Sequence, residues 1–166
     1  MFKIGERIIY GSEGVFEITE YASSPIDKSD DRVFYILKPV YGPQGNIIFT
    51  PADNDKTVMR QIMSQSEAKI LIEKMISILP LEVEREKNRR DLYKFCMIST
   101  EPENYVRLIK TVYLRREEFA KQKRRLSDAD TDYEKKAKFC LYGELSIALD
   151  MPFEKVEEYI SNKLFK

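Results

Sequence analysis

The first 62 residues alternate between short apolar runs and polar breaks. β-Branched and aromatic side chains dominate the runs, and Gly or Pro stands in most of the breaks between them. Runs of this length and spacing are typical of short antiparallel strands joined by turns. The pattern therefore predicts a small antiparallel barrel or sheet, with strands at residues 8–10, 15–21, 33–38 and 46–50.

From residue 63 onwards the apolar positions recur at helical spacing. Ser64 and Glu67 have the spacing of a capping box, and the helix they open is expected to end at Pro80. A second such pattern, from Thr100 to Glu103, predicts the start of another helix. In all, residues 63–166 are predicted to form a bundle of about five helices, beginning near residues 64, 82, 100, 127 and 152. The expected fold class is therefore α+β, with a β domain at 1–62 and a helical domain at 63–166.

The composition bears on the cellular location of the protein. The 166 residues carry 28 basic and 28 acidic side chains, and no apolar run is long enough to cross a membrane. No apolar signal segment is visible, so we expect a cytoplasmic protein that does not bind membranes. We also expect it to act as a monomer. Cys96 and Cys140 lack C-x-x-C spacing and are expected to be buried in a reducing compartment.

The chain contains no histidine. This removes the commonest general acid–base group and the commonest ligand for transition metals. Carboxylates such as Glu13 and Glu17, near the glycine turn, leave a small enzyme as one alternative, although the same spacing suits surface residues of strands. We therefore expect no catalytic residues, no metal and no cofactor.

The balanced net charge conceals local basic clusters. Residues 1–62 carry seven basic and nine acidic side chains, so the excess of positive charge lies in the helical part. Such clusters attract phosphate backbones, although a solvated helix face, neutralised by nearby Glu and Asp, is the alternative. The basic residues concentrate at Arg85, Lys87, Arg89, Arg90 and Lys94, and again at Arg115, Arg116, Lys121, Lys123, Arg124 and Arg125.

A series of short motifs runs along most of the chain in a characteristic order. The opening pattern F-x-I-G-x-x-I-x-Y-x-x-x-G-V-x-x-I is followed by Y-x-L at Tyr35 and by P-A-x-N at Pro51. Further motifs are Arg60-Gln61-Ile62-Met63-Ser64, Arg89-Arg90, Leu126-Ser127 and Gly143-Glu144-Leu145. In their order and spacing these motifs resemble those of the CarD-like (CdnL) bacterial transcription regulators. The N-terminal part also resembles the polymerase-interacting domain of the transcription-repair coupling factor.

The resemblance implies a fold and two partners. It implies that residues 1–62 form a Tudor-like (Tudor/SH3-like) barrel that docks on the β subunit of bacterial RNA polymerase by extending a sheet edge. The docking strand would contain Asn46, Ile47, Ile48, Phe49 and Thr50. The helical domain would contact promoter DNA at the upstream edge of the bubble and change the lifetime of the open complex. Its DNA-contacting residues would be Lys87, Arg89, Arg90, Lys94, Arg124 and Arg125.

The position of the family's tryptophan is one at which this chain departs from the pattern. These regulators wedge a tryptophan into the minor groove, whereas this chain has no tryptophan and places Lys87 there. A lysine binds phosphate but does not unstack a base step as an indole does. The alternative is therefore a polymerase-binding paralogue or protein-interaction module without productive wedging of DNA.

Overall fold

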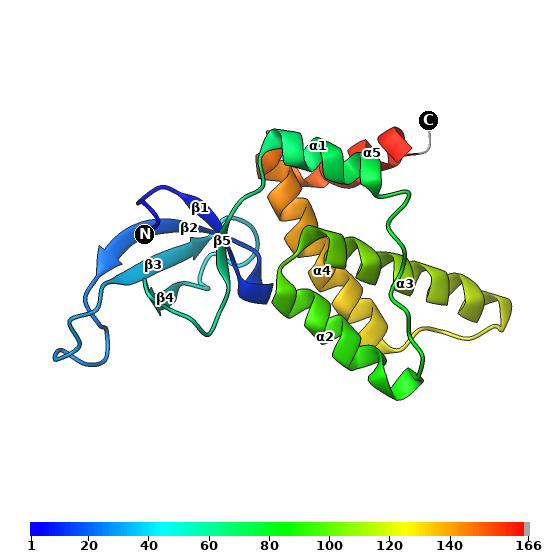
Figure 1. Ribbon diagram of the computed structural model, residues 1–166, viewed down its shortest axis with the longest axis horizontal. Coiled ribbons are helices and arrows are strands. Elements are labelled where there is room, and N and C mark those ends of the chain that lie inside the picture. The colour runs from blue at the N-terminus through cyan, green and yellow to red at the C-terminus, as the bar shows by residue number, and fades with distance from the viewer. Residues whose placement is uncertain (165–166) are drawn as a thin grey trace. The chain divides into compact units, whose positions relative to one another are not determined.

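The computed structural model describes residues 1–164, apart from the side chain of Leu164. It has an α+β fold, with a sheet in the N-terminal part and five α-helices in the C-terminal part (Figure 1). The chain divides into two compact units, Met1–Ile62 and Met63–Lys166. Each unit has its own hydrophobic core.

The N-terminal unit is a five-stranded antiparallel sheet in the order β4-β3-β2-β1-β5. Among the described residues no ladder joins β4 to β5, so the sheet is open and closure into a barrel is not observed. This leaves β4 and β5 as its two edges. The strands are β1 (Arg7–Tyr10), β2 (Val15–Ala22), β3 (Phe34–Pro39), β4 (Ile48–Pro51) and β5 (Met59–Gln61).

The glycine-rich start of the chain forms a corner of this sheet. A 3₁₀ turn at Gly11–Glu13 joins β1 to β2. Gly11 has a φ of 48°, and a Cβ atom there would lie 2.7 Å from Cγ2 of Thr57. The turn therefore needs glycine for both its backbone conformation and its close packing. The core below it consists of Ile8, Phe16, Ile18, Tyr35 and Leu37.

The C-terminal unit consists of five helices whose apolar faces share one core. Helix α4 contacts each of the other four helices. Cys96 and Cys140 are both buried, as expected, and neither forms a disulfide. None of the described helices combines the length and apolar character that a membrane crossing requires. The helices are α1 (Gln65–Lys74), α2 (Arg89–Ser99), α3 (Pro102–Lys121), α4 (Asp128–Ala148) and α5 (Phe153–Leu164).

Two predicted helix boundaries are wrong, and tertiary contacts explain the first. Helix α1 ends at Lys74 instead of continuing to Pro80. The Lys110 ammonium on α3 donates hydrogen bonds to the carbonyls of Ile76 and Ile78, at 3.2 and 2.6 Å, and so satisfies backbone groups beyond the helix end. Helix α2 begins only at Arg89, after a 3₁₀ turn, η2, at Glu86–Asn88.

The capping predictions have mixed outcomes. At α1 the capping box is confirmed, because Glu67 N–H donates to Ser64 Oγ at 3.1 Å and Ser64 N–H to Glu67 Oε2 at 2.7 Å. The box predicted at Thr100 is wrong. Thr100 adopts a left-handed conformation that ends α2, and α3 starts at Pro102 without a side-chain cap.

Candidate functional site

The strand β4 presents one apolar side chain at an edge of the sheet. Thr50 lies opposite Tyr35 and is buried, whereas Phe49 lies opposite Ile36 and is 49 % exposed. Phe49 is therefore not a core residue. The strand spans residues 48–51, so the predicted strand residues Asn46 and Ile47 lie in the exposed turn before it.

The direction of the backbone groups on β4 follows from its register. Ala52 N–H donates to the Val33 carbonyl at 2.8 Å, which makes this a hydrogen-bonded pair. Such pairs alternate along an antiparallel ladder, so Thr50 and Ile48 bond to β3, while the N–H and C=O of Phe49 point away from it. An unpaired strand edge with an apolar side chain beside it is the arrangement that accepts an added strand.

Three of the predicted DNA-contacting residues gather around the start of α2. Lys87 lies in η2, and Arg90 and Lys94 are one turn apart on α2, so these two share a helix face. All three side chains are exposed, and no carboxylate lies within ion-pair distance of them in the described residues. They form a basic surface suited to phosphate oxygens, and we call Lys87, Arg90 and Lys94 the α2 patch.

Arg89, which was also expected to contact DNA, does not belong to this exposed surface. The residue is only 9 % exposed. Its Nε donates to Asp130 Oδ1 at 2.8 Å, and its Nη1 bonds to Glu86 Oε2. The guanidinium is therefore occupied inside the unit, because a buried carboxylate on α4 requires a compensating charge.

The environment of Asp130 shows why it stays ionised. Burial pushes the pKa of this carboxyl upwards, but hydrogen bonds from Ser127 and Tyr93 and the charges of Arg89 and Arg115 together hold it below its usual value. Tyr93 has a raised pKa, because it is buried and donates its hydroxyl to Asp130. The pair of Asp130 and Arg89 is thus charged at neutral pH.

Arg124 and Arg125 lie in the connection between α3 and α4, and both are exposed. The Arg124 guanidinium stacks on the ring of Phe119, with its central carbon 4.5 Å from the ring centroid. Arg115 packs on the same ring at 4.9 Å. We call Arg124 and Arg125 the loop patch. The sequence analysis did not find Phe119, Glu86 or Asp130, because a single buried carboxylate or aromatic residue has no local signature.

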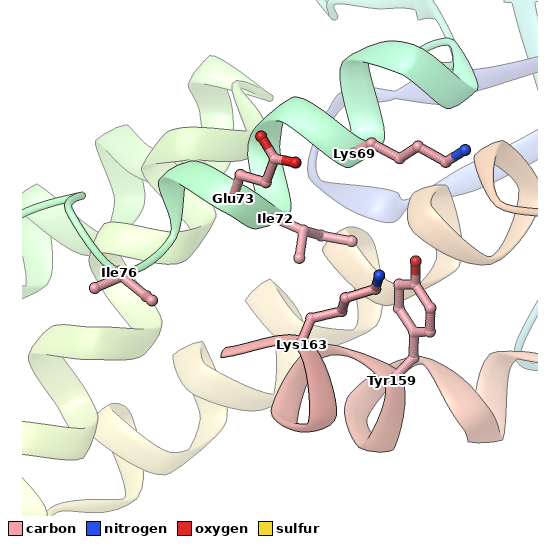
Figure 2. Close-up of a pocket in the computed structure, with 6 residues that line it drawn as sticks. All are labelled: Lys69, Ile72, Glu73, Ile76, Tyr159 and Lys163. Atoms are coloured by element: carbon pink, nitrogen blue, oxygen red, sulfur yellow. The ribbon is translucent and has the colours of Figure 1, made fainter. Parts of the chain in front are cut away.

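A hollow of about 400 Å³ lies between α1 and α5 (Figure 2). Ile72 points into it from α1, and Lys163 lies beside Tyr159 on α5, with the ammonium 5.8 Å from the ring centroid. Glu73 is its one carboxylate. Its described lining therefore contains neither a pair of carboxylates nor a Ser, Thr or Cys nucleophile.

The two carboxylates that the sequence offered as catalytic candidates lie at the surface. Glu17 on β2 lies 3.6 Å from the guanidinium of Arg7, directly across the ladder from it. Glu13 is an exposed residue of the 3₁₀ turn. Within residues 1–164 no group of Cys, Asp and Glu side chains is arranged to hold a metal ion. No protein-family model matches the chain, and no curated protein matches it.

Proposed function

We propose that the protein is a non-enzymatic transcription regulator of the CarD-like type. Its N-terminal unit would dock on the β subunit of bacterial RNA polymerase, and its C-terminal unit would contact promoter DNA. The observation that carries the proposal is the open edge at β4, where the backbone groups and the side chain of Phe49 face outwards together. A Tudor-like barrel identity for this unit, a cytoplasmic location and action as a monomer are parts of the same proposal.

Docking would add a strand of the polymerase to β4. The outward N–H and C=O of Phe49 would pair with the added strand, and the exposed ring would enter an apolar pocket on the partner. Ile47, which is also exposed, would extend this contact along the edge. In this mode the backbone supplies affinity and alternate side chains supply specificity.

DNA contact would come from the α2 patch and the loop patch. Lys87, Arg90 and Lys94 would bind phosphates near the upstream edge of the bubble, assisted by Arg124 and Arg125. Because no tryptophan is present, the contact would be electrostatic and would change the lifetime of the open complex without wedging a base step.

Capture on the immobilised β-subunit lobe tests the docking step with the full chain. We expect Phe49→Asp to abolish capture, because it places a charge in an apolar interface. The control is Val58→Asp, which alters an apolar residue of similar exposure, 45 %, next to the opposite edge strand. If Phe49→Asp is captured as well as the wild type, β4 is not the docking edge.

The lifetime of the open complex separates the main proposal from its alternative, a polymerase-binding paralogue that does not engage DNA. The internal position of Arg89, together with the absence of tryptophan, favours this alternative. We expect the wild type to change the lifetime on a native promoter and a Lys87→Ala/Arg90→Ala variant to have less effect. An equal effect of both proteins would support the alternative.

A further inference from the structure

A buried carboxylate connects the elements that carry the two basic patches. Asp130, in the first turn of α4, is fully buried. Its Oδ1 accepts hydrogen bonds from Arg89 Nε at 2.8 Å and from the Tyr93 hydroxyl at 2.9 Å. Its Oδ2 accepts a hydrogen bond from Ser127 Oγ, also at 2.9 Å. Asp130 thus fastens the start of α2 to the start of α4.

The 3₁₀ turn that carries Lys87 is tied to the same cluster. Glu86, the residue before Lys87, accepts a hydrogen bond from Arg115 Nη1 at 2.7 Å and bonds to Arg89 through its other oxygen. The Arg115 Nε lies 3.6 Å from Asp130 Oδ1. The turn is therefore held by two arginines that both face Asp130.

Arg115 also continues the chain of contacts towards the loop patch. Arg115 and Arg124 pack against one ring, that of Phe119, at 4.9 and 4.5 Å from its centroid. A continuous path then runs from Asp130 through Arg115 and Phe119 to Arg124. The α2 patch and the loop patch lie at the two ends of a single network.

We propose that Asp130 is a positioning residue that, without touching DNA, holds the α2 patch and the loop patch together as one phosphate-binding surface. This inference rests on the proposed DNA contact. Its physical basis is pre-organisation: backbone segments that are already held in place lose less conformational entropy when the side chains they carry bind phosphates.

The direction in which one substitution changes the affinity for DNA distinguishes a positioning role from a purely electrostatic one. Asp130→Asn removes a negative charge near two basic patches, so a purely electrostatic role predicts tighter binding to DNA. If Asp130 positions the patches, the same substitution weakens binding. We expect the affinity for forked promoter DNA at 0.1 M salt to fall about five- to tenfold, which corresponds to the loss of one phosphate contact, and the salt dependence to become shallower.

Glu134→Gln is the matched control. Glu134 lies on the same helix, one turn after Asp130, and pairs with Arg116 and Lys138 outside the network. It makes the same change in charge, so we expect unchanged or tighter binding to DNA. Equal effects of Asp130→Asn and Glu134→Gln would overturn the inference.

A second readout does not depend on DNA. Amide hydrogen exchange at residues 86–90 and 122–127 should be faster in Asp130→Asn than in Glu134→Gln. If Asp130→Asn fails to fold, Tyr93→Phe replaces it in the experiment. This variant removes one hydrogen bond to Asp130 without changing any charge. We then expect faster exchange at residues 86–90 and weaker DNA binding. Unchanged exchange and affinity in Tyr93→Phe would overturn the inference.

The failure of the inference and that of the proposed function remain distinguishable. A Lys87→Ala/Arg90→Ala/Arg125→Ala variant removes exposed side chains and leaves Asp130 and the network around it in place. If it binds DNA as tightly as the wild type, the proposed DNA contact fails, and the inference fails with it. If it binds weakly while Asp130→Asn binds normally, only the positioning role is excluded.

Discussion

Phe49 lies opposite Ile36 in the β3–β4 ladder, in a pair whose backbone groups on β4 face the open edge of the sheet. Proline is tolerated at such a position, because the N–H that it removes makes no bond within the sheet. We expect Phe49→Pro to change the free energy of unfolding by less than about 1 kcal/mol and to abolish capture by the polymerase β-subunit lobe. Urea unfolding and the capture assay measure the two effects.

Ile48→Pro and Phe49→Ala complete this experiment. Ile48 faces β3, so proline there should destabilise the sheet by about 1–3 kcal/mol, because a ladder hydrogen bond is lost. Phe49→Ala keeps the edge N–H and removes only the ring, so it should weaken capture less than Phe49→Pro. Normal capture of Phe49→Pro would contradict strand addition at β4.

Arg89 and Arg90 are neighbours in the sequence with opposite roles. We expect Arg89→Ala to lower the free energy of unfolding by about 3 kcal/mol, because it leaves the Asp130 carboxylate buried without its closest cation. Arg90→Ala should change it by less than about 0.5 kcal/mol, yet weaken DNA binding and lower the salt slope by about one. Thermal unfolding and binding titrations over a range of salt concentrations test both. Equal stabilities of the two variants would contradict the internal role of Arg89.

Asp130 should make the free energy of unfolding of the helical unit depend on pH. Its pKa in the folded protein lies below the usual value of 3.8, so the unfolded state takes up the proton first as the pH falls. The stabilisation is therefore fully present above about pH 5, declines as the unfolded carboxyl titrates around pH 4, and is lost as the pH falls through the folded pKa. We expect the difference in unfolding free energy between the wild type and Asp130→Asn to shrink from pH 5 towards pH 3. Urea unfolding, followed by the helical circular dichroism signal, measures it, and a difference that does not change with pH would contradict an ionised Asp130.

Helix α4 ends in a Schellman motif with an unfavourable residue. Met151 N–H donates to the Ser146 carbonyl at 3.0 Å and Asp150 N–H to the Ile147 carbonyl at 3.2 Å, with Asp150 at a φ of 51°. Asp150→Gly should stabilise the protein by about 1 kcal/mol, because glycine adopts this conformation without strain and the carboxylate at the helix C-terminus is removed. Thermal unfolding measures the gain. Asp150→Ala removes the charge but keeps the strain, so a gain as large as that of Asp150→Gly would contradict the backbone explanation.

Local features of the sequence predicted the elements of the fold well. Gly and Pro between short β-branched runs predicted the antiparallel sheet, and helical periodicity predicted the five helices. The capping box at Ser64 was correct because its hydrogen bonds join residues three positions apart. The end of α1 was predicted wrongly, because Lys110, more than 30 residues away, supplies the donors for the backbone beyond it.

The sequence by itself determined the α+β class, a short apolar strand that ends at Pro51 and the concentration of basic residues in the helical part. Only the tertiary structure decided which of these basic residues face solvent. Arg89 and Arg90 are indistinguishable in the local sequence pattern. Only Arg89 is buried, because it pairs with Asp130, which lies 41 positions after it. The physical reason is that local periodicity depends on neighbouring residues, whereas the partner of a buried charge is selected by packing between helices that are distant in the chain.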